Sequence, residues 1–213
     1  IAYTRVPKGG PEWNEIARIN ESFVHRLHFS IIQTGLSMEA LAEHLRGVAC
    51  FADGAGDSYG LRIGDSRVAD CLQGIFTPEQ WDALTAPIAF WQINNRRGET
   101  VKLVLSEARL QLNPGEPRQL HLSDEQIDQL MEASEPDGLL AQIGKEPTPD
   151  SAQYTQSRYE TACNCIRIWK ASGSSDRRVL IELVQRVFEQ GTSNRHDELW
   201  MRRRLDEAVA VMR

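Results

Sequence analysis

The chain has 213 residues, of which 41% are hydrophobic and 25% are charged, and its formal net charge at pH 7 is -6. These values are typical of one globular domain with an appendage, and the length is sufficient to bury a full core. The acidic balance argues against a nucleic-acid-binding protein, which favours a basic face. No apolar run approaches the roughly 20 residues that a membrane-spanning helix needs, so we expect neither nucleic acid nor a membrane as a partner.

The N-terminal region, residues 1–36, is expected to be an extension that contains one helix. The chain begins with Ile1 rather than Met and shows no signal peptide, which predicts a fragment of a longer protein or a processed product. From Glu12 to about Gln33, apolar residues recur at three- and four-residue spacing, which predicts an amphipathic helix that ends at Gly35. The apolar positions of this helix are Trp13, Ile16, Ile19, Phe23, Leu27 and Ile31.

The main domain is expected over residues 37–213. Ser37 suits a helix N-cap, because its hydroxyl can accept a backbone N–H at the start of a helix over residues 38–46. Residues 48–70 contain four glycines between short apolar runs, which predicts two or three short antiparallel strands.

Thr77-Pro78-Glu79-Gln80 is a strong helix start, because Thr can cap, Pro fits the first helical position and Gln can complete a capping box. We expect this helix to continue through Trp91 with a kink at Pro87. Residues 98–112 fit either a helix or a strand.

The second half of the chain is expected to be helical. Residues 123–126 start a helix with a second capping box. Residues 134–153 are polar and proline-rich, which predicts an excursion within an insertion over about 110–153. Further helices are expected over 154–171, 176–190 and 195–212. The predicted fold is α+β and mostly helical, with a small antiparallel sheet early in the chain and a helical C-terminal lobe.

The cysteines and histidines do not predict a metal site. Cys163 and Cys165 have one residue between them, which is poor metal-ligand spacing. Buried free thiols are expected, since free Cys behaves as a small core residue; one disulfide joining Cys50 or Cys71 to residues 163–165 is the alternative. His25 and His28 have helical metal spacing but no evident third ligand, so we expect no metal and no cofactor.

Two carboxyl groups in residues 43–64 are candidates for glycoside hydrolysis, which needs one protonated acid and one ionised carboxylate. Glu43 lies among leucines near the end of the expected helix, an apolar setting that would keep its proton. Asp53 lies in a Gly-rich turn, where backbone N–H groups and solvent would keep it ionised. Ser58 follows as a candidate for holding a water molecule. The alternatives are a solvated helix end for Glu43 and an ordinary turn residue for Asp53.

Residues 43–64 run from Glu-His-Leu-Arg through an aromatic residue, Asp53 and a Gly-containing turn to a Tyr-Gly-Leu-Arg-Ile-Gly strand. This stretch resembles the catalytic opening of phage-type lysozymes, the muramidases of glycoside hydrolase family 24. Residues 76–90 resemble a later helix of that family, and residues 166–186 resemble its closing helices. The gap between the two carboxyl residues is one residue longer than the family's, and His44 stands where the family has glycine.

The resemblance implies a lysozyme-like fold and an enzyme that cleaves the β-1,4 bond between N-acetylmuramic acid and N-acetylglucosamine in peptidoglycan. Glu43 would be the acid, with Glu21 of the N-terminal helix as the alternative acid. The other site residues expected are Asp53 and Ser58 for catalysis and Tyr59 and Arg46 for substrate binding. We expect a C-terminal toxin domain of an antibacterial effector that is secreted or delivered to the periplasm of a target bacterium. A cognate immunity protein is then expected as a partner.

Two other functions compete with the muramidase. The longer carboxyl gap and the acidic charge favour a catalytically inactive lysozyme-fold module that binds peptidoglycan or a protein. Asp53-Gly54 and Gly64-Asp65-Ser66-Arg67 also resemble the Ala-Asp-Gly and Gly-Asp-Ser-Arg motifs of metal-dependent phosphatases. Those motifs lie far apart in that family but are nearly adjacent here, so this is the least favoured of the three functions.

Overall fold

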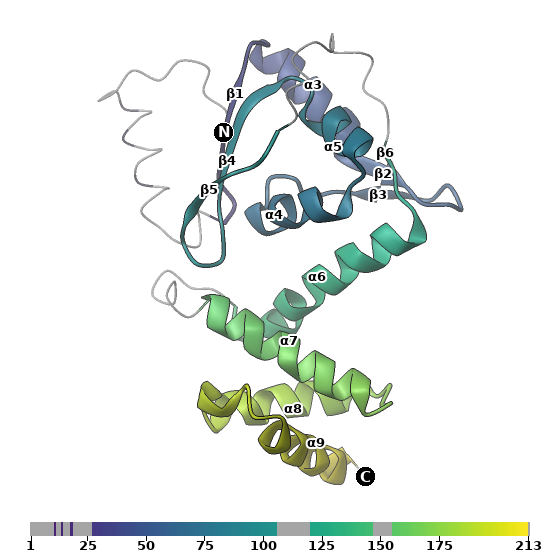
Figure 1. Cartoon of the computed structure of the whole chain (residues 1–213), viewed down its shortest axis with the longest axis vertical. Coiled ribbons are helices and arrows are strands. Elements are labelled where there is room, and N and C mark those ends of the chain that lie inside the picture. The colour runs from purple at the N-terminus through teal and green to yellow at the C-terminus, as the bar shows by residue number, and fades with distance from the viewer. Residues whose placement is uncertain are drawn as a thin grey trace. The chain divides into compact units, whose positions relative to one another are not determined.

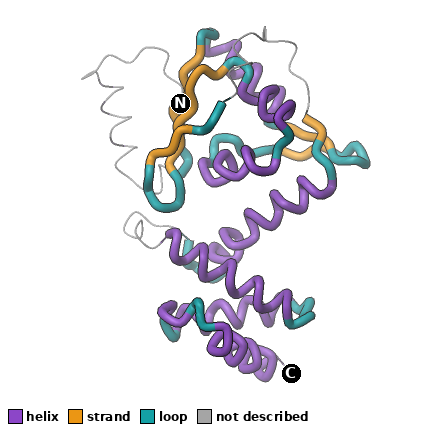
Figure 2. The backbone as a smooth tube through the Cα atoms, viewed as in Figure 1, coloured by secondary structure: helices purple, strands orange, loops and turns teal. Residues whose placement is uncertain are grey.

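The computed structural model describes residues 27–105, 120–146 and 155–212, together with Pro11, Asn14 and Arg18, which are helical. The described residues form an α+β, mostly helical structure with a small antiparallel sheet early in the chain, as predicted (Figures 1 and 2). None of the described helices is long and apolar enough to span a membrane.

Two compact units make up the chain. Unit 1 comprises Ile1–Ala133 and Thr148–Ala152, and unit 2 comprises Ser134–Pro147 and Gln153–Arg213. Helix α6 (Asp124–Gln142) begins in unit 1 and ends in unit 2. The excursion predicted from residue 134 is therefore wrong over 134–142, where the helix continues.

Sheet A of unit 1 contains β1 (Ser30–Thr34), β4 (Ile88–Asn94) and β5 (Thr100–Lys102) in the order β1-β4-β5, with antiparallel neighbours. Ile32 lies opposite Trp91 in the pairing of β1 with β4. Trp91 and Ile93 lie in the core of unit 1 and Ile32 packs against it, so one side of the sheet supplies core residues. Among the described strands, β1 and β5 are the two edges of this sheet.

Sheet B contains β2 (Cys50–Ala52) and β3 (Ser58–Gly60), which form an antiparallel hairpin, and β6 (Leu120–His121), which runs parallel to β2. The hairpin confirms the strands predicted within residues 48–70. The end of that region differs, because α4 (Ser66–Ile75) begins there instead of a third strand.

Local capping explains where the early helices begin. Ser37 accepts a hydrogen bond from the backbone N–H of Ala40 and caps α3 (Met38–Val48), as predicted. Asp65 caps α4 by accepting from the backbone N–H of Arg67.

Both predicted capping boxes are present. At α5 (Pro78–Thr85), Gln80 N donates to Thr77 Oγ1 and Thr77 N donates to Gln80 Oε1. At α6, Gln126 N donates to Ser123 Oγ and Ser123 N donates to Gln126 Oε1. Each box satisfies two helix-start N–H groups.

The two glutamines also bind each other. Gln126 Nε2 donates to Gln80 Oε1 at 2.7 Å, and Gln80 Nε2 lies 3.2 Å from Gln126 Oε1. Gln80 further donates to the carbonyl of His121, and Gln126 to the carbonyl of Ile75. The starts of α5 and α6 are therefore joined directly, although they are 46 residues apart in the sequence.

The core of unit 1 centres on two stacked tryptophans. The rings of Trp81 in α5 and Trp91 in β4 lie 6.2 Å apart and within 2° of parallel. Trp81 Nε1 donates to the carbonyl of Val104, and Trp91 is 1% exposed. The other large buried members of this core are Phe51, Leu61, Leu72, Phe76, Leu84, Ile88, Ile93, Leu103, Leu120 and Leu122.

Unit 2 packs three further helices with the end of α6, and these confirm the three C-terminal helices predicted from the sequence. They are α7 (Thr155–Ala171), α8 (Arg177–Glu189) and α9 (Glu198–Met212). Apolar residues of all four elements share one core, and Leu139 of α6 is fully buried in it. Burial of Leu139 explains why the polar segment after residue 134 is helical.

Two predicted helices are wrong in part. The helix expected over residues 12–33 is a strand over Ser30–Thr34, and most of the residues before it lie outside the described part of the chain. The helix expected through Trp91 ends at Thr85, after which Pro87 precedes a strand. In both places β-branched and aromatic residues pair with a distant strand, which local spacing does not reveal.

Candidate functional site

Asp53 lies at the turn of the β2–β3 hairpin, where its carboxylate organises the loop. Oδ1 accepts from the backbone N–H groups of Ala55 at 3.0 Å and Asp57 at 2.9 Å, and Oδ2 accepts from the hydroxyl of Tyr59 at 3.2 Å. Gly56 has a φ of 88°, a left-handed conformation that favours glycine. These contacts match the turn role that was the alternative for Asp53.

Tyr59 fixes the other side of this hairpin. Its ring stacks on Phe51 with centroids 5.4 Å apart, and its side chain remains 45% exposed. The negative charge of Asp53, and then its hydrogen bond from the hydroxyl, raise the pKa of Tyr59. Tyr59 is thus held in place by both ends of the side chain, the ring and the hydroxyl.

Glu43 and Arg46 lie on the exposed face of α3. The helix contacts α5 through His44, whose Nε2 lies 2.9 Å from the carbonyl oxygen of Leu84. The desolvated setting expected for an acid at position 43 is therefore absent, because this side chain is exposed.

The remaining predicted residues are distributed differently. Ser58 begins β3 and lies opposite Ala52, next to Asp53 in the hairpin. Glu21, the alternative acid, lies outside the described residues. Among the described hydrogen bonds and ion pairs, none joins Glu43 to Asp53. The structure therefore unites Asp53 with Tyr59 and leaves Glu43 on a separate element.

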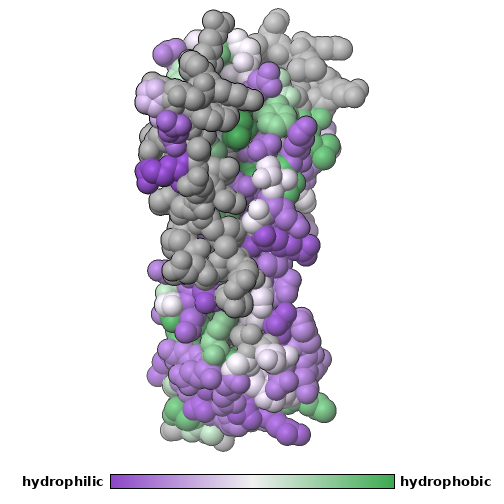
Figure 3. Space-filling view, turned by 90° about the vertical axis from the view of Figure 1, so that its left-hand side faces the viewer, coloured by the Kyte–Doolittle hydropathy of each residue, from purple (hydrophilic) through white to green (hydrophobic). Residues whose placement is uncertain are grey.

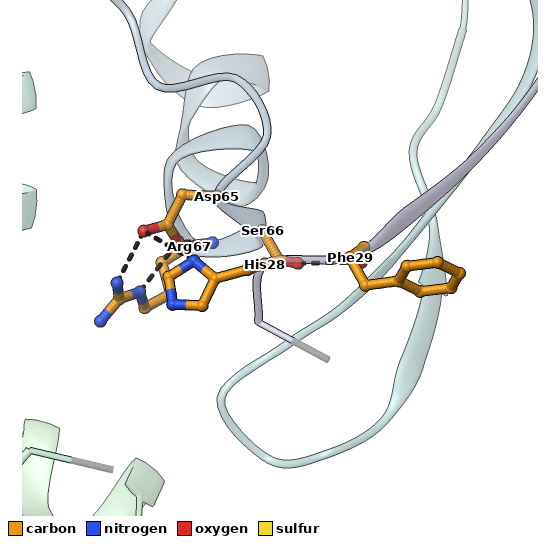
Figure 4. Close-up of polar contacts among 5 residues, drawn as sticks. All are labelled: His28, Phe29, Asp65, Ser66 and Arg67. Atoms are coloured by element: carbon orange, nitrogen blue, oxygen red, sulfur yellow. Dashed lines mark hydrogen bonds and ion pairs between the residues drawn. The ribbon is translucent and has the colours of Figure 1, made fainter. Parts of the chain in front are cut away.

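A second polar cluster surrounds Asp65 (Figure 4). Oδ1 accepts from Arg67 Nε at 2.9 Å, and Oδ2 accepts from Arg67 Nη2 at 2.6 Å. His28 Nδ1 lies 3.9 Å from Oδ2. Burial raises the pKa of the Asp65 carboxyl, but hydrogen bonds and charge from Arg67 outweigh burial, so the pKa lies below its usual value. Asp65 is 5% exposed and is thus a buried, ionised carboxylate.

The neighbouring Ser66 ties this helix start to the segment before β1. Its backbone N–H donates to the carbonyl of Leu27 at 2.7 Å. Its hydroxyl donates to the carbonyl of Phe29 at 3.4 Å, as Figure 4 shows. In the sequence, residues 64–67 resemble only a phosphatase motif. The signal for their observed role was present: Asp before an apolar helical pattern is a common N-cap.

The described residues contain neither a candidate metal site nor a disulfide bond. They contain no group of three or more His, Cys, Asp or Glu side chains that could hold a metal ion. All four cysteines are free; Cys165 is buried, and burial raises its pKa to about 12, whereas Cys50 is exposed. Asp53 and Asp65, the two acids of the phosphatase-like motifs, belong to separate clusters with different partners.

Comparison with protein families, with curated proteins and with solved structures finds no match to this chain.

The structural role of Asp53 gives a direct prediction. Asp53→Ala removes the acceptor of three hydrogen bonds and should lower the free energy of unfolding by about 1–3 kcal/mol. Asp53→Asn keeps one oxygen for the two backbone donors and should cost less. Urea unfolding followed by tryptophan fluorescence measures both. Asp57→Ala is the matched control, because that carboxylate is exposed in the same loop. Equal stability of Asp53→Ala and Asp57→Ala would contradict the role.

Proposed function

We propose that this chain is a binding module without glycosidase activity and that its ligand is a protein. The observation that carries the proposal is the engagement of Asp53 by two backbone N–H groups and the Tyr59 hydroxyl. A catalytic carboxylate must instead present an oxygen to a water molecule or to the sugar carbon. In this hairpin, both oxygens of Asp53 already serve the loop.

The position of Glu43 supports the same proposal. A general acid that works near neutral pH keeps its proton because an apolar, partly desolvated site raises its pKa. Glu43 is exposed to water on α3, so it lacks the apolar, desolvated site that such an acid needs.

Charge favours a protein over peptidoglycan as the ligand. Unit 1 contains 12 Lys and Arg residues and 19 Asp and Glu residues, a net charge of -7. Bacterial cell walls are anionic, so this unit would be repelled by them. Among the residues coloured in Figure 3, hydrophilic side chains predominate and hydrophobic side chains form small groups. A neutral or basic protein segment suits this acidic unit better than an anionic cell-wall polymer.

Purified peptidoglycan tests the proposal. We expect the wild-type chain to release no new reducing ends and no muropeptides detectable by mass spectrometry, and not to sediment with the insoluble polymer. Glu43→Gln is the matched variant and should behave as the wild type. A lysozyme of known activity is the positive control.

Muramidase activity is the second candidate function, because Glu43 on α3 and Asp53 in the hairpin lie on consecutive elements of the chain. It predicts the opposite result: release of muropeptides by the wild type and a loss of at least ~100-fold in Glu43→Gln, since general acid catalysis contributes that much. Such a result would overturn the binding-module proposal. It would also support the expected role as an antibacterial effector with an immunity protein.

A further inference from the structure

Strand β1 is one edge of sheet A, and its pairing shows which of its backbone groups face outward. Leu103 N donates to the carbonyl of Trp91, so the backbone groups of Trp91 point toward β5. In an antiparallel ladder, a residue's N–H and C=O point to the same side and alternate along the strand. Ile32 lies opposite Trp91 and Ser30 lies opposite Ile93. The N–H and C=O groups of Ser30 and Ile32 therefore point away from β4.

These four groups have no hydrogen-bond partner among the described residues, and β4 is the one described strand that pairs with β1. They form two donor–acceptor pairs, spaced two residues apart along an extended backbone. A partner must therefore offer one acceptor and one donor at every second residue. The backbone of another extended strand does so, whereas a side chain or a helix does not.

The side chains of β1 lack the usual protection of a sheet edge. Proteins commonly block edges with charged residues, especially Lys, or with Pro. The sequence of β1 is Ser-Ile-Ile-Gln-Thr, with no charge and no Pro, whereas the opposite edge strand, β5, carries Lys102. Ile31 is 43% exposed on the face of the sheet away from the core. Within the described part of the chain, the backbone of this edge is thus unpaired, and its own side chains do not block it.

We propose that β1 accepts an extended, uncharged segment of a partner protein as an additional antiparallel strand of sheet A. This inference rests on the proposed function and names the chemistry of its ligand. Ile32 would exchange two hydrogen bonds with the residue opposite it. Ile31 would face its new neighbour in the closer, non-hydrogen-bonded type of pair, which favours an apolar or β-branched residue there.

Amide hydrogen exchange measured by NMR on the full chain tests this directly. The probe is an acetylated and amidated peptide, Thr-Val-Thr-Val-Thr. In the free chain, the amides of Ile31 and Gln33 should be protected by β4, and that of Ile32 should exchange quickly. With the peptide in excess, exchange at Ile32 should slow by about tenfold or more, while Ile31 and Gln33 change little.

Two variants separate strand addition from general binding. Ile31→Lys places a charge at the edge and should weaken peptide binding by about tenfold or more. Gln129→Lys, an exposed position on α6, adds the same charge elsewhere and should bind as the wild type. Ile32→Pro removes one outward N–H that β4 does not use, and it should also weaken binding. Tryptophan fluorescence checks that each variant is folded.

Several results would overturn the inference. One is an Ile32 amide that is protected in the dilute, peptide-free chain, since another part of the chain would then occupy the edge. A second is protection that rises with protein concentration alone, which would assign the edge to a second copy. A third is absent binding, or binding that leaves Ile32 unprotected. If the chain is also inert toward peptidoglycan, these results reject the strand addition and leave the binding module standing. Release of muropeptides would reject the proposed function itself.

Discussion

Replacing Trp91 with alanine should lower the free energy of unfolding by about 3–5 kcal/mol, because a large ring is removed from a site that cannot collapse around the gap. Trp91 is 1% exposed and stacks on Trp81, and it joins sheet A to α5 in the core of unit 1. Urea unfolding monitored by far-ultraviolet circular dichroism gives the free energy without relying on the deleted fluorophore.

Two variants control this prediction. Phe90→Ala lies on the opposite face of the same strand, where the ring is half-buried beneath Lys102, and should cost less. Trp91→Phe keeps an aromatic ring and removes an indole N–H that has no hydrogen-bond partner among the described residues, so it should be milder than alanine. A loss below about 1 kcal/mol for Trp91→Ala would contradict the assigned core.

Asp65→Ala should be the second severe substitution, at about 3–5 kcal/mol, because it breaks a buried ion pair and the two side-chain hydrogen bonds that Arg67 donates to this carboxylate. The change also removes the N-cap of α4 and leaves Arg67, which is 17% exposed, without its carboxylate. Asp65→Asn preserves a good capping side chain and removes the charge, so it should fall between the wild type and alanine. Chemical unfolding at pH 7 ranks the three proteins.

The same residue predicts how stability changes with pH. The pKa of Asp65 is lower in the folded chain than in the unfolded chain, where an Asp titrates at about 3.9. Its contribution is therefore fully present above the unfolded pKa and is lost as the pH falls through the folded pKa. Between pH 6 and pH 3, the urea midpoint of the wild type should fall more steeply than that of Asp65→Asn. Parallel curves would show that another group controls acid stability.

Elements with local signals were predictable from the sequence. Ser37, Thr77 and Ser123 mark helix starts through hydrogen bonds to residues three positions away, so a short window contains the whole interaction. The three helices expected over 154–171, 176–190 and 195–212 are present as α7, α8 and α9. Strands β1 and β4 were mistaken for helix, because each is stabilised by the other across more than fifty residues.

The candidate site was predictable only in part, for the same reason. The sequence placed Asp53 in a glycine-rich turn, and the hairpin confirms that position. The bond from the Tyr59 hydroxyl depends on the register of β2 with β3, which spacing alone does not determine. The exposure of Glu43 depends on which face of α3 packs on α5. Neither the Tyr59 hydrogen bond nor the exposure of Glu43 can therefore be predicted from the neighbouring residues in the sequence.

The pair Gln80 and Gln126 has a consequence for the order in which the chain is completed during synthesis. A ribosome that has released the residues through α5 has made one of these glutamines but not the other. Gln80 can bind Thr77 and the carbonyl of His121 without Gln126, but the carbonyl of Ile75 and the bonds between the two glutamines need residue 126 to have emerged. A nascent chain stopped before that point should therefore remain sensitive to protease at the start of α5, and one extended past it should become resistant.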